Sequence, residues 1–540
     1  MQEHCFSHFK KLELSDVMPI QNVERLKYSL INPIIMGLGL VLRLKLITNQ
    51  RRALIIIFST SCIVRIIPEL FAYPYPIGYD VVNYYIPVLA NFKAHWLVIS
   101  GQFPLYILVL HLINIYSGLS PHLTVITFST VVFGFFGVSV FLIARRLMEL
   151  GIHQSIFLTI FVIFQIAVLR EAWDLHRDIF ALLTMFLTFS LIGRETKKIC
   201  TRYVPFALAL SVITAISDGM IGALFVTSLI IYAGITRDKY VILCVLVASS
   251  SFLLAVLPSQ NTFHINIERF SKASPITTAP SNDQYNQINL LILFGVINGL
   301  LIPTGIIGFK VVKNKLLKIP LLIVIVVSFS WVVFPDMKSL VADRWIIVSG
   351  IFLSFFAACG ILHLVQRLES QHVVTAIFLS VSGIFVIMGI AYAIMSEDMP
   401  FILYAVTRNN IETFVPVTMQ ANSVSIKDTD KIINAVSWIN NNTDQNSIIT
   451  GDKSLRGWIE MDLKGNRTYI FSENLNNRFL DKVIEEHKNV YLVTYFKEPN
   501  NRSTSMVYSN GKFNIYKMGK QDSNHQILNL DQYLRSNSIK

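Results

Sequence analysis

Long apolar runs separated by short polar stretches fill the chain up to about residue 395. A helix needs about 20 residues to cross the hydrocarbon core of a bilayer, and most of these runs approach that length. The pattern predicts eleven membrane-spanning helices, some of them short. They are expected over residues 53–71, 121–144, 155–170, 178–193, 203–217, 219–234, 240–257, 289–308, 319–335, 345–366 and 373–395.

Two further apolar stretches do not match a simple span. Residues 30–47 carry Arg43 and Lys45, which favours an amphipathic helix lying in the membrane interface. Residues 102–118 contain His111 and are marginal as a span. The number of crossings therefore depends on a second property of the chain, the distribution of its positive charge.

Lysine and arginine are unevenly distributed between the segments that join the spans. If residues 102–118 do not cross, one side holds about three times as many of these residues as the other, the bias typical of cytoplasmic loops. If they did cross, Arg145–Arg146, "RETKK" and "KVVKNKLLK" would lie outside. We therefore expect a cytoplasmic N-terminus, an extracytoplasmic C-terminus, and residues 102–118 at or dipping into the outer surface.

The pattern changes beyond residue 395. Residues 430–440 place apolar side chains on one helical face, residues 447–450 and 489–495 are typical of buried strands, and Asn510–Gly511 is a strong hairpin signal. The fold class expected is a polytopic helical membrane protein with a small extracytoplasmic α/β domain. The predicted parts are a cytoplasmic segment, a membrane module and this domain, over residues 1–52, 53–395 and 396–540.

Composition supports a membrane protein, because 53% of the residues are hydrophobic and only 15% are charged. The net charge of +12 is explained by cytoplasmic loops and does not require a nucleic-acid partner. The five cysteines have no paired spacing, so we expect neither a disulfide framework nor a zinc site. The first twenty residues lack the apolar core of a cleavable signal peptide.

With this topology, the clusters of acidic residues in the membrane module emerge on the outer side. Asp80 follows the first span in "YPYPIGYDVVNYY", "REAWDLHRD" covers residues 170–178, Asp218 lies in "ISDGM", and "FPDMKSLVADRW" precedes a late span. Charge buried at membrane depth is costly and commonly marks a functional site. The sequence therefore predicts a site at the outer surface of the membrane module.

Each of these features also has a purely structural interpretation. Asp80 and Asp218 are each open to interpretation as a turn residue, and Tyr84 and Tyr85 as interfacial anchors. Arg65 and Glu69 lie four residues apart and are expected to pair on one helix face. The acids of residues 170–178 are open to interpretation as a salt-bridge cluster with Arg170 and Arg177, and Asp343–Arg344 as a helix cap. His176 and His264 are too isolated to predict a histidine metal site.

Four placements together resemble the GT-C-type integral membrane glycosyltransferases that use polyprenyl-phosphate-linked sugars. They are "RIIPELFAYPYPIGYDVVNYY", the stretch 102–146, "REAWDLHRD", and "ADRW" ahead of an outer domain. The form "WDLHRD" is most similar to archaeal, dolichyl-phosphate-dependent members. The "WWDYG" signature of oligosaccharyltransferases is absent and the second-loop acids are spaced Glu-x-x-Asp, which favours transfer of one monosaccharide outside that branch.

The resemblance implies roles for individual residues. Asp80 is expected to act as general base or to position the acceptor, with Glu171 and Asp174 completing the catalytic site. In some members the second-loop acids hold a divalent cation, Mg or Mn, which makes Glu171 and Asp174 weak metal-ligand candidates. The lipid phosphate is expected to meet Arg344 and Lys338, with Arg177 behind them.

The function predicted is an inverting membrane glycosyltransferase. It would move a monosaccharide from a polyprenyl-phosphate donor to a lipid-linked glycan or protein acceptor at the outer face of the bilayer. Two alternatives stay open: a transporter or flippase, and a non-catalytic membrane scaffold or sensor. A transporter is expected to show internal repeats and ionisable groups near the midplane; here the polar groups gather at one surface.

Overall fold

The structure is a computed structural model of the chain. It describes residues 49–90, 92, 103, 105–193, 203–256, 290–333, 342–366, 380, 424, 428–452, 455–472, 477–487, 489–495 and 504–518. The predicted amphipathic helix at 30–47, the predicted span at 373–395 and the whole predicted segment 1–48 lie outside these residues. The proposed domain boundaries at residues 52 and 395 stay predictions.

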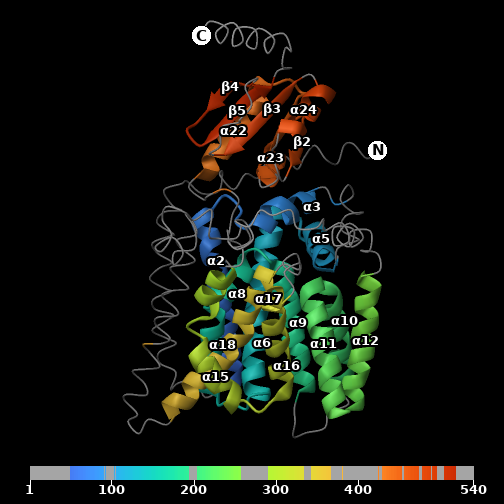
Figure 1. The fold of residues 1–540 in the computed structure, drawn as a ribbon, viewed down its shortest axis with the longest axis vertical. Coiled ribbons are helices and arrows are strands. Elements are labelled where there is room, and N and C mark those ends of the chain that lie inside the picture. The colour runs from blue at the N-terminus through green and yellow to red at the C-terminus, as the bar shows by residue number, and fades with distance from the viewer. Residues whose placement is uncertain are drawn as a thin grey trace, which may run out of the picture.

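The described chain has a bundle of apolar helices at one end and a small α/β domain at the other (Figure 1). The helices of the bundle and its connections are α2 (Gln50–Ala72), the π-helical turn η3 (Val81–Tyr85), α3 (Ile86–Ala90), α5 (Leu105–Ser117), α6 (Pro121–Arg146), α7 (Ile152–Ile163), α8 (Ile166–Trp173), α9 (His176–Ile192), α10 (Val204–Ser217), α11 (Gly219–Thr236), α12 (Lys239–Val256), Leu290–Asn298, α15 (Ile302–Val311), α16 (Lys315–Ser328), α17 (Ser330–Val333) and α18 (Ala342–Gln366).

Six helical segments of the described chain are long and apolar enough to cross a membrane, and the number rises to eight if each of two bent helix pairs is one span. The protein is thus a multi-pass membrane protein, as the apolar runs predict. Two other predicted spans form shorter helices, α9 with 17 residues and α10 with 14. The predicted total of eleven includes residues 373–395 and stays a prediction.

Within the stretch 102–118, Leu105–Ser117 form the short helix α5, whose 13 residues are too few to cross a bilayer unaided. Figure 1 places α3 and α5 at the end of the bundle that faces the α/β domain. Tyr106, Ile107 and Leu110 are buried, whereas Leu112 and Ile115 are exposed. That this stretch does not cross the membrane stays a prediction.

A bend between α7 and α8 determines where the acidic segment lies. The two helices are bent by 62° at the break between Ile163 and Ile166. At the break, Gln165 has an extended backbone and its side-chain amide donates to the Phe161 carbonyl at 3.3 Å. This bond satisfies a carbonyl near the end of α7 and leaves α8 to run in a new direction.

The α/β domain contains a five-stranded sheet in the order β2-β1-β3-β5-β4. Strand β1 pairs in parallel with β2 and β3, while β5 pairs antiparallel with β3 and β4. Its strands and helices are α22 (Thr429–Asn442), β1 (Ile448–Asp452), α23 (Arg456–Asp462), β2 (Thr468–Ser472), α24 (Asn477–Glu486), β3 (Val490–Tyr495), β4 (Thr504–Ser509) and β5 (Phe513–Met518).

Two hydrophobic clusters fill the domain. One unites α22 and α23 with side chains of the sheet such as Ile449 and Ile515, and the other unites α24 with side chains that include Leu492. The predicted hairpin is present, with Asn510 N–H donating to the Phe513 carbonyl at 3.2 Å and Gly511 at a φ of 82°. The buried face of α22 is the one that its apolar spacing predicts.

Candidate active site

Asp80 occupies the start of η3, directly after the turn that leaves α2. Gly78 has a φ of 101°, in the left-handed region that favours glycine, and the Val82 N–H donates to its carbonyl at 3.0 Å. A Cβ on Gly78 would lie 2.6 Å from the Trp173 carbonyl oxygen, so this glycine lets the turn pack directly against the end of α8. The proline- and glycine-rich sequence therefore fixes Asp80 beside the second acidic segment.

A hydrogen bond from the Asp80 backbone joins the two predicted acidic segments. The N–H of Asp80 donates to Asp174 Oδ1 at 2.5 Å, across 94 residues of sequence. Asp174 Oδ2 forms an ion pair with Arg170 Nη2 at 2.8 Å, and both side chains are almost fully buried. Asp174 thus joins α8 to the Asp80 turn and has both oxygens engaged.

Glu171 and Asp178 form a second, deeper acidic pair. Their side chains are 0% and 1% exposed, and Glu171 Oε1, Glu171 Oε2 and Asp178 Oδ2 have no hydrogen-bond donor among the described residues. The two carboxyl groups lie within reach of each other, so one proton held between them would satisfy oxygens on both. The structure therefore brings Glu171 into the cluster, facing Asp178.

Asp218 has a structural role that its turn-like sequence predicts. Its side chain caps α11 by accepting hydrogen bonds from the N–H groups of Met220 at 2.8 Å and Ile221 at 3.0 Å. It also lies close enough to the deeper acids and the arginines to act on them electrostatically. It adds negative charge to the site while remaining a helix cap.

Arginines from two helices face these acids. The Arg177 guanidinium lies 5.6 Å from the ring centroid of Tyr84, in cation–π contact, and Arg344 comes from the first turn of α18. Both act electrostatically on Asp80, as does Arg170. The structure thus places two of the three predicted phosphate-binding residues with Asp80, and the third, Lys338, lies outside the described residues.

Burial and the neighbouring charges determine the ionisation of Asp80. Burial and then the negative charge of Asp174 raise the pKa of the Asp80 carboxyl, while Arg177, Arg344 and Arg170 lower it. The result is a pKa raised to about 6. A carboxylate in this range combines ionisation near neutral pH with more basicity than an ordinary aspartate.

Tyr85 is not the interfacial anchor that its sequence permits. Its side chain is fully buried, and its ring stacks on the His176 imidazole with centroids 5.3 Å apart and planes 11° apart. The reason is that η3 turns this side chain into the helical core, against Tyr106 at 5.5 Å. Tyr84 is partly buried below Arg177 and contributes to the site through that contact.

Arg65 and Glu69 form the predicted ion pair on α2, at 2.8 Å and almost fully buried. Arg65 Nη2 also donates to Ser129 Oγ and to His176 Nε2, both at 3.1 Å. Because a guanidinium can only donate, Nε2 must accept and His176 must be neutral. His176 is therefore a packing and hydrogen-bonding residue that supports Tyr85, which the sequence had not indicated.

The weak metal site expected at Glu171 and Asp174 stays a prediction. Among the described residues, no group of three or more histidine, cysteine, aspartate or glutamate side chains is arranged to hold a metal ion. Both oxygens of Asp174 already have partners, from Arg170 and from the Asp80 N–H.

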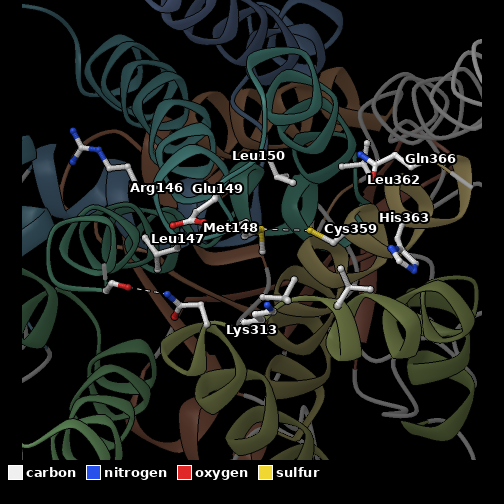
Figure 2. Close-up of a pocket in the computed structure, with 14 residues that line it drawn as sticks. Arg146, Leu147, Met148, Glu149, Leu150, Lys313, Cys359, Leu362, His363 and Gln366 are labelled. Carbon is white, nitrogen blue, oxygen red and sulfur yellow. Dashed lines mark hydrogen bonds between the residues drawn. The ribbon is translucent and has the colours of Figure 1, made fainter. Parts of the chain in front are cut away.

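A pocket of about 450 Å³ lies elsewhere, between the ends of α6, α9, α15 and α18 (Figure 2). Cys359 and Met148 meet across it with their sulfur atoms 3.5 Å apart, and Lys313 and His363 line it. These helix ends are remote from the α/β domain in Figure 1. None of the predicted site residues lines this pocket, so it is separate from the acidic site.

No family model and no curated protein matches the chain. Solved structures do: ArnT from Cupriavidus metallidurans in the apo state matches with a TM-score of 0.50 at 11% identity, over 86% of this chain and 99% of that one. The chain has a GT-C-like fold. ArnT bound to undecaprenyl phosphate gives a TM-score of 0.48 at 11% identity, over 88% of this chain and 100% of that one. Mycobacterial arabinofuranosyltransferase AftD gives 0.41 at 12%, over 88% and 42%.

Within this GT-C-like fold, the residues that the sequence singles out gather at the end of the bundle nearer the α/β domain. The structure brings together Asp80 with Asp174, and Glu171 with Asp178, and it sets Arg177 and Arg344 beside them.

Proposed function

We propose that the protein is an inverting membrane glycosyltransferase that takes a monosaccharide from a polyprenyl-phosphate carrier. The observation that carries the proposal is the Asp80 carboxyl, half-buried, with a pKa raised to about 6 and with Arg177 and Arg344 acting on it. A base and fixed positive charge are the two requirements of glycosyl transfer from a lipid phosphate. The GT-C-like fold and the sequence motifs around residues 80 and 170–178 support the same reaction class.

The proposed chemistry is a single displacement at the anomeric carbon. Asp80 removes the proton of the acceptor hydroxyl while the acceptor oxygen forms the new glycosidic bond. At the same time, the bond between the anomeric carbon and the donor phosphate breaks. Arg177 and Arg344 stabilise the negative charge that collects on the leaving phosphate; a guanidinium suits this role because its planar fork can bind two phosphate oxygens. Asp174 holds the Asp80 turn in place through its hydrogen bond.

The proposed location is the outer face of the bilayer, at headgroup height. The donor is anchored by its lipid, so the site must lie where a lipid phosphate lies. The bias of lysine and arginine toward the opposite loops supports this orientation. The proposed acceptor is a lipid-linked glycan or a protein; the dolichyl carrier and the archaeal affiliation are proposals from the sequence resemblance alone.

The test uses the full chain reconstituted in lipid nanodiscs with a panel of polyprenyl-phosphate-linked sugars and short-chain lipid acceptors, with products measured by mass spectrometry. We expect transfer of one sugar by the native protein and a loss of about 10²- to 10⁴-fold for Asp80→Asn. Asp238→Asn is the matched control, because the Asp238 side chain caps α12 through the Tyr240 N–H at 2.7 Å and is not among the groups that act on Asp80. Native rates in Asp80→Asn would exclude the base role, and donor-independent substrate uptake into vesicles without transfer would favour a transporter.

A further inference from the structure

The turn that carries Asp80 is shared by the two parts of the molecule. Val81 and Tyr85 of η3 belong to a cluster with Tyr106 and other side chains of the helical part. Val82, between them, belongs instead to the hydrophobic core of the α/β domain. One turn of π-helix therefore contributes its two faces to two different cores.

Helix α23 packs on this turn without intervening side chains. A Cβ on Gly457 would lie 1.9 Å from the Val82 carbonyl oxygen and 2.9 Å from the Asn83 Cα, which shows that backbone meets backbone here. The Gly457 N–H donates to Asn83 Oδ1 at 2.8 Å. Met461, one turn further along α23, packs against both hydrophobic clusters. The α/β domain thus packs directly against η3.

A second bond from the domain reaches the residues just before η3. The Tyr75 hydroxyl donates to Asp430 Oδ1 at 2.7 Å, from the first turn of α22. On its other side the same turn is closed by Gly78 against the Trp173 carbonyl and by the Asp80 N–H on Asp174. The Asp80 turn is therefore held between the α/β domain and the helical acidic segment.

A displacement of the Val82 backbone is expected to move Asp80 as well, because the two residues belong to one short hydrogen-bonded turn. Val82 donates to the Gly78 carbonyl at 3.0 Å, and Ile86 donates to the Val81 carbonyl, so the turn moves as a hydrogen-bonded unit. Asp80 begins that unit, two residues before Val82. Contact with α23 is thus transmitted to the carboxylate through a short rigid segment.

We propose that Gly457 and Asn83 are positioning residues, through which the α/β domain holds Asp80 at the distance from Asp174 and the arginines that transfer requires. The inference rests on the proposed function for its kinetic consequence and on the contacts of η3 for its structural one. It makes the α/β domain a working part of the active site, beyond any role in acceptor recognition.

The central variant is Gly457→Ala in the full chain. Because protein Cβ atoms essentially never come within 3.0 Å of such an atom, the new methyl group must move α23 or η3 by about 1 Å, a displacement able to cost about a hundredfold in rate. Gly234→Ala in α11 is the matched control, since no atom of the described residues lies within 4 Å of the Cβ it adds. Asn83→Ala removes only the side-chain bonds of Asn83 and serves if Gly457→Ala does not fold.

Two measurements separate the positioning role from the reaction itself. Hydrogen–deuterium exchange over residues 78–86 is expected to accelerate in Gly457→Ala and Asn83→Ala and to stay native in Gly234→Ala, with no donor or acceptor present. In transfer assays, kcat is expected to fall by about ten- to a hundredfold with a smaller change in KM, and the acid limb of the pH profile is expected to shift, because the Asp80 environment changes.

Each outcome has a defined meaning. Native exchange over residues 78–86 together with native kinetics and pH profile in both variants would overturn the inference. Faster exchange at this turn supports the mechanical coupling even if neither the native protein nor any variant transfers sugar. In that case the proposed function fails, and the role of α23 in holding η3 in place stands. A fall in rate with an unchanged pH profile and native exchange would also overturn it, because the loss would then arise away from Asp80.

Discussion

The raised pKa of Asp80 predicts the pH dependence of transfer. In the proposed mechanism Asp80 must be ionised to accept the acceptor proton, and its pKa of about 6 means that the ionised fraction grows as pH rises through that value. From about pH 5 to about pH 7 this fraction rises from about one-tenth to about nine-tenths, so kcat/KM is expected to rise by about tenfold. An aspartate with its ordinary pKa would already be ionised at pH 5 and would give an almost flat profile.

The assay is the initial rate of sugar transfer by the reconstituted protein at several pH values, with donor concentrations below KM. The phosphodiester of the donor and the hydroxyl of the acceptor do not titrate in this range, so an acid limb reports the enzyme. Asp80→Asn is expected to lose the limb together with most of the activity. A return to pH 7 after incubation at pH 5 must restore the rate, which separates titration from unfolding.

Two results would contradict a base at Asp80 with a pKa near 6. A rate that is constant between pH 5 and pH 7 would show that Asp80 is ionised throughout, so that burial and Asp174 do not hold its pKa near 6. A rate that falls as pH rises would show that the limiting group must be protonated, which is the behaviour of a general acid and has the opposite sign.

Three further changes test one charge at the site and two contacts inside the helical part. Arg344→Gln removes a positive charge that is proposed to stabilise the leaving phosphate. It is expected to lower kcat by about 10²- to 10³-fold in the transfer assay, with partial recovery in Arg344→Lys. Glu69→Gln leaves the buried Arg65 guanidinium without its counter-ion, so the free energy of unfolding is expected to fall by about 3–5 kcal/mol, measured as a lower thermal midpoint. The control is Lys482→Ala in the exposed Lys482–Glu486 pair, which is expected to leave the midpoint unchanged. Gly360→Ala would place a Cβ 1.9 Å from the Thr304 carbonyl oxygen where α15 packs on α18, so we expect a loss of about 1–3 kcal/mol in the same measurement, with Gly295→Ala as the unaffected control.

The apolar runs predict most of the helical part because a membrane helix satisfies its backbone internally, so its length and composition are local properties. The same locality explains the hairpin at Asn510–Gly511 and the buried face of α22. It also explains why the sequence does not predict some elements of the α/β domain. Helix α24 and strand β2 carry short, mixed patterns that only their partners in the sheet and its two hydrophobic clusters stabilise.

Prediction of the site was limited by contacts that are remote in sequence. The sequence indicates that Asp80 and residues 170–178 matter, but it does not show that the Asp80 backbone N–H binds Asp174 while Asp174 forms an ion pair with Arg170. Nor does it show that Arg65 fixes His176 in its neutral form, or that Tyr85 is buried against that ring. These facts depend on the 62° bend before α8 and on η3, neither of which has a local sequence signal.

The environments of the acids distinguish their roles more clearly than their positions in sequence do. Asp174 has an arginine on one oxygen and a backbone N–H on the other, and Asp218 is committed to capping α11, so neither carboxylate is placed to receive a proton from an acceptor. Glu171 and Asp178 are sealed from solvent and face each other. Asp80 makes its hydrogen bond to Asp174 through its backbone, which leaves its carboxylate out of that bond, at a half-buried position beside the arginines. A base must be reachable by the acceptor and ionised near neutral pH, and among these five described acids those two conditions favour Asp80.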